Sequence, residues 1–547
     1  MRPLLILLCA ACGAKAAVPP TAVADLVLVN GDVLTMDPLR PRADGVAVVG
    51  DKIEAVGDAA EIKAWIGPHT RVVDLAGRAV SPGLVDGHCH LYELGRFLDQ
   101  IDLRGAATPE EVAARVKAAA KGRGAGEWIR GRGWDQNLWP TKTFPTRALL
   151  DDIPQPVALE RIDGHAYWMN GAALRAMKLG PTDPPFGKIV RDARGEPTGI
   201  LVDLDPLVEK AAPVDPPDVR RRQILHAAEV ALAAGITGIH EMGIDDVTIG
   251  VYRQLAAEGK LPLRVWALLR ATELIDELPR RRAERDPTGT AFFVLGGVKL
   301  FADGALGSRG ALLLEPYADD PGNRGLEVTS REALERGARN AKAGGWQLAV
   351  HAIGDRANRN VLDAFEAAGV GPNDRFRVEH AQILSLADIP RFAKLGVIAS
   401  MQPTHATSDM PWAEARVGRA RLAGAYAWRS LLDAKAVVVG GSDFPVEEVP
   451  IRNGIAAAVS RQDRTGKPEG GWLPEQRVTL DEALRMFTVA PAFASFQEAR
   501  RGRIVPGFVA DLTVFDRALF PDAAALYATE VDLTIVGGRV AYERSKK

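Results

Sequence analysis

Short apolar runs rich in Val, Ile and Leu alternate with amphipathic stretches through the middle of the chain. The runs are bounded by Gly, Pro or polar residues and predict strands, and patterns such as RNVLDAFEAAG predict helices between most of them. Strands that alternate with helices favour a parallel sheet in an α/β fold. Eight predicted strands would close a (β/α)8, TIM-like barrel, and they lie near residues 82–87, 236–241, 263–269, 293–301, 347–351, 376–381, 396–401 and 436–442.

The two ends of the chain show a different pattern, with short strands and little helical period. Hairpin signals such as Asn30-Gly31 interrupt the N-terminal strands, and the C-terminal segments GRIVPGFVADLTVFD and VDLTIVGGRVAYE have the same texture. We expect residues 19–81 and 497–547 to fold together into one small composite β-sandwich, and residues 82–496 to form the barrel. Two separate edge hairpins are the alternative for the ends.

The stretch from about 100 to 225 is too long for a single connection between barrel strands. It holds a helical pattern, TPEEVAARVKAAAKG, and the Trp-rich segment WIRGRGWDQNLWP. We interpret it as an inserted subdomain over the barrel mouth, because loops of this length in compact domains usually serve function. Its residues Trp128, Trp134 and Trp139 would either wall an apolar pocket or pack in a core.

The first 18 residues form a segment of their own, which we predict to be a signal peptide or a lipoprotein signal. Arg2 precedes a short apolar run that is too brief to span a bilayer. Ala14-Lys15-Ala16 fits a cleavage site, whereas CAAC fits a lipoprotein box with Cys12 as the lipidated residue. Both interpretations predict an exported bacterial protein, either periplasmic or anchored to a membrane through Cys12, and a plain hydrophobic start is the alternative.

Composition and charge narrow the classes of partner. The chain of 547 residues is 25% charged with a formal net charge of −2, which is ordinary for a globular protein. Nucleic-acid binding would require a basic stripe, and none is seen. We therefore expect no nucleic-acid partner, and a homo-oligomer is left open.

Residues able to bind a metal recur where predicted strands end. The carboxyl ends of parallel strands converge on one face of a barrel, where barrel enzymes carry out their chemistry. A set of histidines with one aspartate on that face is typical of a catalytic metal site. The set comprises His88, His90, His351, His380 and Asp443, with Lys299 inside an apolar strand.

Three local arguments refine this set. His88 and His90 are two apart on an extended strand, so both side chains point the same way and Cys89 points away. Burial of Lys299 would favour its neutral amine, which can react with carbon dioxide to form a carbamate that bridges two ions; a snorkelling lysine is the alternative. Asp443 could accept a proton from a metal-bound water and pass it on, or it could simply form a turn.

Other polar residues are candidates for substrate binding. His165 lies in the insertion, His240 ends the second predicted strand and so would face the mouth, and Asp303 and Arg309 follow Lys299. A structural or supporting role is the alternative for each of them. One further histidine, in QPTHATSD after the seventh predicted strand, would approach the substrate.

The motifs PGLVDGHCH, VKLFADG, HAIGDRA, RVEHAQ and GSDFP, in this order, resemble the metal-dependent amidohydrolase superfamily. The insertion motifs GWDQNLW and RIDGHAYWMN resemble its YtcJ-like branch, amidohydrolase family 3, which includes N-substituted formamide deformylases. The resemblance implies a (β/α)8 barrel with a composite β-sandwich, and two divalent ions, usually zinc. It implies that His88 and His90 bind the more buried ion with Asp443, that His351 and His380 bind the second, and that a carboxylated Lys299 bridges them.

The resemblance also implies a small-molecule substrate. We therefore expect a metal-dependent hydrolase that cleaves a non-peptide carbon–nitrogen bond, in an amide, N-formyl, carbamate or cyclic amide group. Metal-activated hydroxide would attack the carbonyl, and Asp443 would act as the catalytic base and acid. A ring-amine deaminase or an ester or lactone hydrolase on the same scaffold is the alternative. A non-catalytic exported binding protein would have lost metal ligands, and all six are present here.

Overall fold

The structure is a computed structural model that describes residues 23–124, 126–161, 166–179, 188–202, 204–212, 215–287 and 291–545. The predicted signal segment, with Cys12, and the candidate His165 lie outside the described residues. The chain divides into two compact units, of which one is Leu91–Ala227 and the other comprises the described residues before and after it. Among the described residues, no helix combines the length and apolar character needed to cross a membrane.

An eight-stranded, all-parallel sheet forms the barrel, with the order β21-β20-β19-β18-β17-β16-β15-β8. The ends of this row meet, because the backbone N–H of Asp443, just after β21, donates to the His88 carbonyl of β8 at 2.8 Å. The predicted α/β barrel is therefore confirmed. Its strands are β8 (Leu84–Cys89), β15 (Ile236–Ile244), β16 (Arg264–Arg270), β17 (Phe293–Phe301), β18 (Gln347–Ala352), β19 (Arg377–His380), β20 (Ile398–Met401) and β21 (Val438–Gly440).

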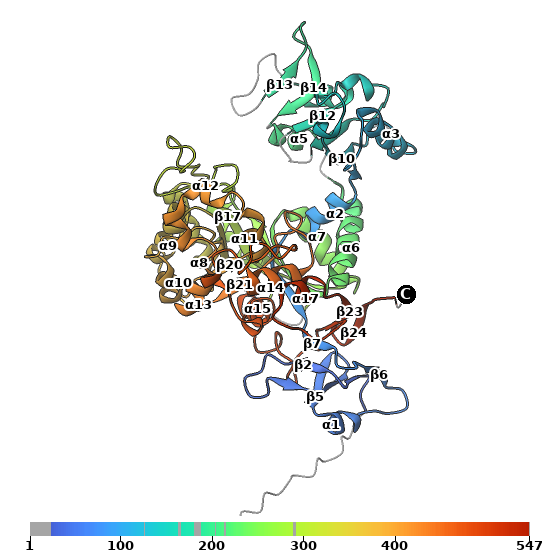
Figure 1. Cartoon of the computed structure of the whole chain (residues 1–547), viewed down its shortest axis with the longest axis vertical. Coiled ribbons are helices and arrows are strands. Elements are labelled where there is room, and N and C mark those ends of the chain that lie inside the picture. The colour runs from blue at the N-terminus through green and yellow to red at the C-terminus, as the bar shows by residue number, and fades with distance from the viewer. Residues whose placement is uncertain are drawn as a thin grey trace, which may run out of the picture. The chain divides into compact units, whose positions relative to one another are not determined.

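Helices separate these strands along the chain, as the periodicity predicts (Figure 1). The strands are buried on both faces, which is why they appear in the sequence as continuous apolar runs. The intervening helices bury only one face; the helix after β17, for example, buries Leu334, Ala338 and Ala341. The helices between barrel strands include α7 (Asp246–Ala257), α8 (Arg331–Ala343), α9 (Asp355–Ala367), α10 (Ile389–Leu395), α11 (Pro403–Asp409) and α13 (Trp428–Asp433).

Strands from both ends of the chain share one sheet, with the order β24-β23-β22-β7-β2-β3. Within it, β7 (Ala79–Pro82) pairs antiparallel with β22 (Leu512–Phe515), and Figure 1 shows the blue strands β2 and β7 beside the red strands β23 and β24. A second sheet, β5-β4-β1-β6, packs against it through a common apolar core that includes Leu28, Val80 and Leu512. The composite β-sandwich is therefore present. Its remaining strands are β1 (Leu26–Val29), β2 (Asp32–Leu34), β3 (Arg42–Ala43), β4 (Gly45–Val49), β5 (Lys52–Gly57), β6 (Arg71–Asp74), β23 (Val531–Val536) and β24 (Arg539–Glu543).

The unit Leu91–Ala227 has its own six-stranded sheet, with the order β13-β14-β12-β11-β10-β9. Trp134, Trp139 and Trp168 form its core, with ring centroids 5.9–6.2 Å apart. Trp134 and Trp139 therefore pack in a core, which was the alternative to walling a pocket. Trp128 is partly buried against a neighbouring apolar cluster. The strands are β9 (Ile101–Asp102), β10 (Ile129–Trp134), β11 (Val157–Arg161), β12 (Ala166–Met169), β13 (Lys188–Arg191) and β14 (Pro197–Val202).

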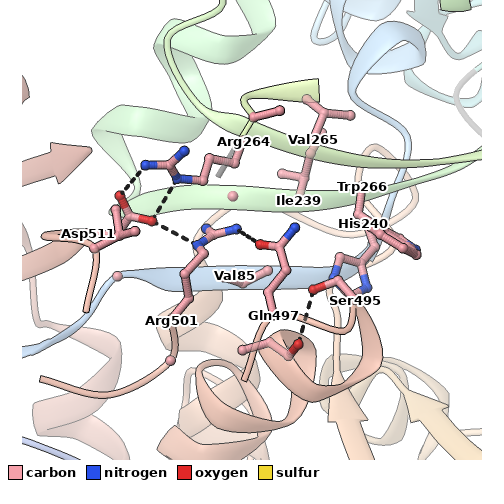
Figure 2. A pocket seen from close by; sticks show the side chains of 16 residues that line it. Val85, Ile239, His240, Arg264, Val265, Trp266, Ser495, Gln497, Arg501 and Asp511 are labelled. Atoms are coloured by element: carbon pink, nitrogen blue, oxygen red, sulfur yellow. Dashed lines mark hydrogen bonds and ion pairs between the residues drawn. The ribbon is translucent and has the colours of Figure 1, made fainter. Parts of the chain in front are cut away.

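A buried charge cluster closes the barrel at the end where its strands begin (Figure 2). Asp511 accepts hydrogen bonds from Arg264 at 2.9 Å and from Arg501 at 3.0 Å, and Arg501 also donates to Gln497 at 2.7 Å. Burial opposes ionisation of Asp511, yet the two guanidinium groups hold its pKa below the usual value. We call these four residues the floor cluster. It borders a cavity of about 20 Å³, which is room for one water.

Candidate metal centre

The barrel brings the predicted histidines and aspartate together at the ends of its strands. The ring centroid of His88 lies 5.6 Å from that of His90 and 4.7 Å from that of His380, which in turn lies 4.6 Å from that of His351. Asp443 approaches from the loop after β21, where a Cβ at Gly441 would lie 2.7 Å from the His88 backbone nitrogen. Glycine at that position therefore lets the last strand end directly against the first.

Two of these residues hold unusual backbone conformations. Asp443 has φ of 62° and His380 has φ of 71°, both in the left-handed region that non-glycine residues seldom adopt. Such conformations cost on the order of 1–3 kcal/mol and are retained mainly at functional sites. At His380 and Asp443 this conformation coincides with side chains that belong to the groups of possible metal ligands.

The distances around Asp443 fit two ligands on one ion better than a hydrogen bond. Its Oδ1 lies 3.4 Å from Nε2 of His88 and 3.2 Å from Nε2 of His90. An N–H···O bond is most often about 2.9 Å long, whereas two ligands of a tetrahedral zinc ion lie about 3.4 Å apart. His88, His90 and Asp443 accordingly form one group whose ligand atoms lie within 4.8 Å of one another.

Hydrogen bonds on the far side of each ring leave Nε2 turned toward the centre. Nδ1 of His90 lies 3.0 Å from the Met242 carbonyl oxygen, Nδ1 of His88 lies 2.6 Å from Glu379 Oε2, and Nδ1 of His380 lies 2.8 Å from Gln402 Oε1. Because each partner is an oxygen acceptor, Nδ1 carries the proton in a neutral ring and Nε2 presents a lone pair. This is the tautomer that binds a metal.

A buried ion pair supports His88 from inside the barrel. Arg377 donates to both oxygens of Glu379, at 2.7 and 3.0 Å, and neither side chain is exposed. Burial opposes ionisation of Glu379, but Arg377 and His88 hold its pKa well below the usual value. Sequence reasoning missed this pair, although two charged residues at i and i+2 of an apolar strand signal a charged patch on its inner face.

His351 and Lys299 lie beside the cluster. Nε2 of His351 is buried, has no hydrogen-bond partner among the described residues, and lies 3.5 Å from Oδ1 of Asp303. Burial, with Lys299 nearby, lowers the pKa of His351 to about 3 and so keeps the ring neutral. Burial also lowers the pKa of Lys299 to about 8, although the charges of Glu379 and Asp443 oppose this shift.

His240, one of the candidate substrate-binding residues, lies inside the barrel. The prediction that His240 faces the mouth is wrong: it is 2% exposed, borders the floor cavity, and its Nδ1 accepts from Arg377 at 2.7 Å. Register explains the error, because β15 continues to Ile244 and His240 is inside the strand rather than at its end.

Asp303 and Arg309 are engaged in protein contacts. The Asp303 carboxylate accepts three backbone N–H bonds, from Leu312 at 2.8 Å, Ile353 at 3.0 Å and Gly354 at 2.8 Å. Arg309 pairs with Asp319 at 2.9 Å. Both contacts favour the supporting alternative over direct substrate binding, since Asp303 joins the loops after β17 and β18 beside His351.

A further histidine reaches the centre from α11. Nε2 of His405 lies 3.7 Å from Oδ2 of Asp443, and its ring stacks on that of His380 with centroids 5.9 Å apart. His380, His405 and Asp443 form a second group whose ligand atoms lie within 4.8 Å of one another. The sequence placed His405 near the substrate but not among the metal ligands.

Comparison with known proteins agrees with this arrangement. A model of the amidohydrolase family matches residues 71–542. The chain belongs to the amidohydrolase family. The YtcJ protein of Bacillus subtilis strain 168, which is named as an amidohydrolase, is 34% identical over 94% of this chain and 99% of its own length. The N-substituted formamide deformylase of Arthrobacter pascens is 30% identical over 96% of this chain and 99% of its own length.

A solved structure resembles the whole chain. The crystal structure of an uncharacterized metal-dependent hydrolase from Pyrococcus horikoshii OT3 has a TM-score of 0.79 and 31% identity, and the match covers 92% of this chain and 99% of that one. The family resemblance predicted from the motifs is therefore confirmed. This amidohydrolase is a metal-dependent enzyme that hydrolyses carbon–nitrogen bonds of small molecules.

Proposed function

We propose that this amidohydrolase cleaves the N-formyl or N-acyl bond of a small secondary amide, giving a carboxylic acid and an amine. The observation that carries the proposal is the convergence of the Nε2 atoms of His88, His90 and His405 on the carboxylate of Asp443. The formamide deformylase relative supports the choice of substrate class, because its similarity extends over nearly the whole chain.

The donor atoms present suit two divalent ions, for which zinc is the first choice. His88, His90 and Asp443 would hold one ion, and His351 and His380 would hold the other. Imidazole and carboxylate ligands favour zinc but also bind iron, manganese or cobalt. When bound, such ions lower the pKa of a water to near 7 and polarise a substrate carbonyl.

Asp443 would move the proton in this reaction. Its carboxylate faces the histidines from the loop after β21 and lies at the centre of the group. It would accept a proton from the attacking water and return it to the leaving nitrogen, so that the amine departs neutral. The bond from the carbonyl carbon to the water oxygen would form first, and the bond between that carbon and nitrogen would break once the nitrogen has received the proton.

Lys299 is proposed to carry a carbamate. The side chain is 1% exposed and lies in an apolar strand, so an unpaired ammonium there is costly. The neutral amine would add carbon dioxide and release one proton, and the product has two oxygens able to join both ions. Mass spectrometry of the intact protein under carbon dioxide, with Lys299→Met as control, would detect or reject this modification.

A product assay tests the proposed reaction. Metal-free protein reconstituted with zinc is offered N-formyl amines, N-acyl amines, ring amines, and esters, and the acid, ammonia and amine released are measured. Formate or another acid with an equimolar amine supports the proposal. Ammonia from a ring amine would identify a deaminase, acid with an alcohol would identify an esterase or lactonase, and no turnover with any class would contradict an enzymatic role.

We also propose that the protein is exported through its first 18 residues. The support is the sequence pattern alone, with Cys12 as the site of a lipid anchor. Labelling of cells with radioactive palmitate distinguishes lipidation at Cys12 from simple cleavage of the signal peptide. Label that disappears in Cys12→Ala identifies a lipoprotein, whereas unlabelled protein shortened near residue 16 identifies simple cleavage.

A further inference from the structure

The two carboxylate oxygens of Asp443 face different histidines. Oδ1 lies 3.4 and 3.2 Å from His88 and His90, while Oδ2 lies 3.7 Å from Nε2 of His405. The His90 separation is at the upper limit of an N–H···O bond and the other two exceed it, and all three lie near the spacing of about 3.4 Å between two ligands of one zinc ion. The second oxygen therefore has the same kind of neighbour as the first.

His405 has a buried nitrogen that the protein leaves without a hydrogen bond. Its Nε2 is inaccessible to solvent and has no hydrogen-bond partner among the described residues. Buried polar atoms are nearly always paired, and an exception in a native fold often marks an ion or a catalytic role. The neighbouring His380 also turns Nε2 inward, because its Nδ1 is bonded to Gln402 at 2.8 Å.

The nearby acid Asp409 does not account for this nitrogen. It accepts hydrogen bonds from the Tyr426 hydroxyl at 2.7 Å and from Gln382 at 2.6 Å. Among the described residues, the acid within ion-pairing distance of His405 is Asp443. The geometry thus directs His405 toward the metal centre rather than toward a structural partner.

We infer that His405 is a ligand of the second ion, together with His380 and Asp443, and that Asp443 joins the two ions through its two oxygens. This inference rests on the metal centre of the proposed function and adds a histidine to the ligands that the family resemblance implies. His351 remains beside His380 at 4.6 Å between ring centroids. Five imidazoles rather than four would then surround the pair of ions.

Metal titration of His405→Ala tests this assignment. Metal-free wild-type protein, His405→Ala and a control, His69→Ala, are titrated with zinc by calorimetry, and bound zinc is counted by mass spectrometry. His69 is an exposed histidine and serves as the surface control. We expect two ions in the wild type and in the control. His405→Ala should keep the first ion and bind the second with affinity lowered on the order of 100-fold or more.

The outcomes separate the two proposals. Two tightly bound ions in a folded His405→Ala protein would overturn the role of His405 while leaving the proposed function intact. A wild-type protein that binds no zinc and cleaves no amide would instead refute the proposed function. Circular dichroism establishes that the variant is folded.

A second measurement needs no variant. A crystal structure of the zinc-loaded wild type gives ion positions from anomalous scattering. We expect an ion about 2.0–2.3 Å from Nε2 of His405, the range of a zinc–imidazole bond with coordinate error. Two ions that both lie more than about 3 Å from this nitrogen would overturn the inference, since that distance excludes a direct bond.

Discussion

The two ends of the barrel both hold buried charge, but they pair it differently. In the floor cluster, Asp511 meets Arg264 and Arg501 at 2.9 and 3.0 Å, so each donor has an acceptor. At the metal centre, Asp443 stands 3.2–3.7 Å from three histidine nitrogens. A cation between these nitrogen and oxygen atoms would satisfy them, whereas the floor cluster pairs its charges without one.

The contrast shows how a structural charge cluster differs from a catalytic one. Charges that satisfy each other at hydrogen-bond distance stabilise a fold and need no ligand. At the metal centre, histidine nitrogens and a carboxylate are held near one another without close pairing, and His380 and Asp443 have strained backbone, which suits a site that binds a ligand. The predictions below separate the two ends by turnover and by stability, from the largest effect on turnover to the smallest.

Metal removal should have the largest effect. Dialysis against a strong chelator is expected to abolish amide hydrolysis and to lower the melting temperature, because an ion that binds only the folded state stabilises it by about 2.7 kcal/mol when free metal is 100 times its dissociation constant. Turnover and melting are measured before and after zinc is returned. Full activity in protein shown to be metal-free would contradict the assignment.

Asp443→Asn is expected to cause the second-largest loss of turnover. The substitution keeps the shape of the side chain but removes the proton acceptor, which typically costs on the order of 10³-fold in turnover. kcat/KM with an N-formyl substrate and the melting temperature are measured on metal-loaded protein. The change is expected in kcat/KM and not in folding. Wild-type turnover in this variant would exclude Asp443 as the proton carrier.

Glu379→Gln should have an intermediate effect. The amide cannot balance Arg377 or fix the tautomer of His88, so metal affinity should fall about 10- to 100-fold, as for other residues that support a metal-bound histidine. Ser400→Ala is a matched control, because Ser400 also accepts from Arg377, at 2.8 Å, but does not contact His88. Excess zinc should restore turnover of Glu379→Gln. Equal losses in both variants would indicate general damage to the core.

Asp511→Asn should leave turnover unchanged and reduce stability. Removing one partner of a buried ion pair usually costs about 3–5 kcal/mol, because the remaining charges lose their counterion. Chemical denaturation measures the loss of stability. The kcat of the folded fraction tests whether the floor cluster affects turnover at the metal centre. A drop in kcat with unchanged metal content would mean that the floor acts on the reaction.

Acid pH should reduce the contribution of Asp511 in the floor cluster to the free energy of unfolding. The folded pKa of Asp511 is held below its unfolded value, so its contribution is complete above about pH 4 and is lost as pH falls toward the folded pKa. The unfolding free energy of the wild type should therefore fall below about pH 4 more steeply than that of Asp511→Asn. Parallel curves for the two proteins would exclude this contribution.

The strands, their order and the residues at their ends could be predicted from sequence for a simple reason. Barrel strands buried on both faces must be apolar along their length, so a histidine or aspartate where such a run ends is easily noticed. His88, His90 and Asp443 were found in this way, and the structure brings them together. The same logic failed for His240, because the sequence does not show that β15 runs on to Ile244.

What the sequence determined by itself is the periodicity: alternating apolar strands and helices, β-rich ends, and polar residues where strands stop. What only the tertiary structure decided is the direction of individual side chains. Strict alternation along β19 would point His380 away from the face shared by Arg377 and Glu379, and a φ of 71° turns it back toward His88. His405 likewise comes within 3.7 Å of Asp443 from α11, which begins just after β20 ends. Such contacts depend on local backbone conformation and on packing between distant segments, which residue patterns along one chain do not encode directly.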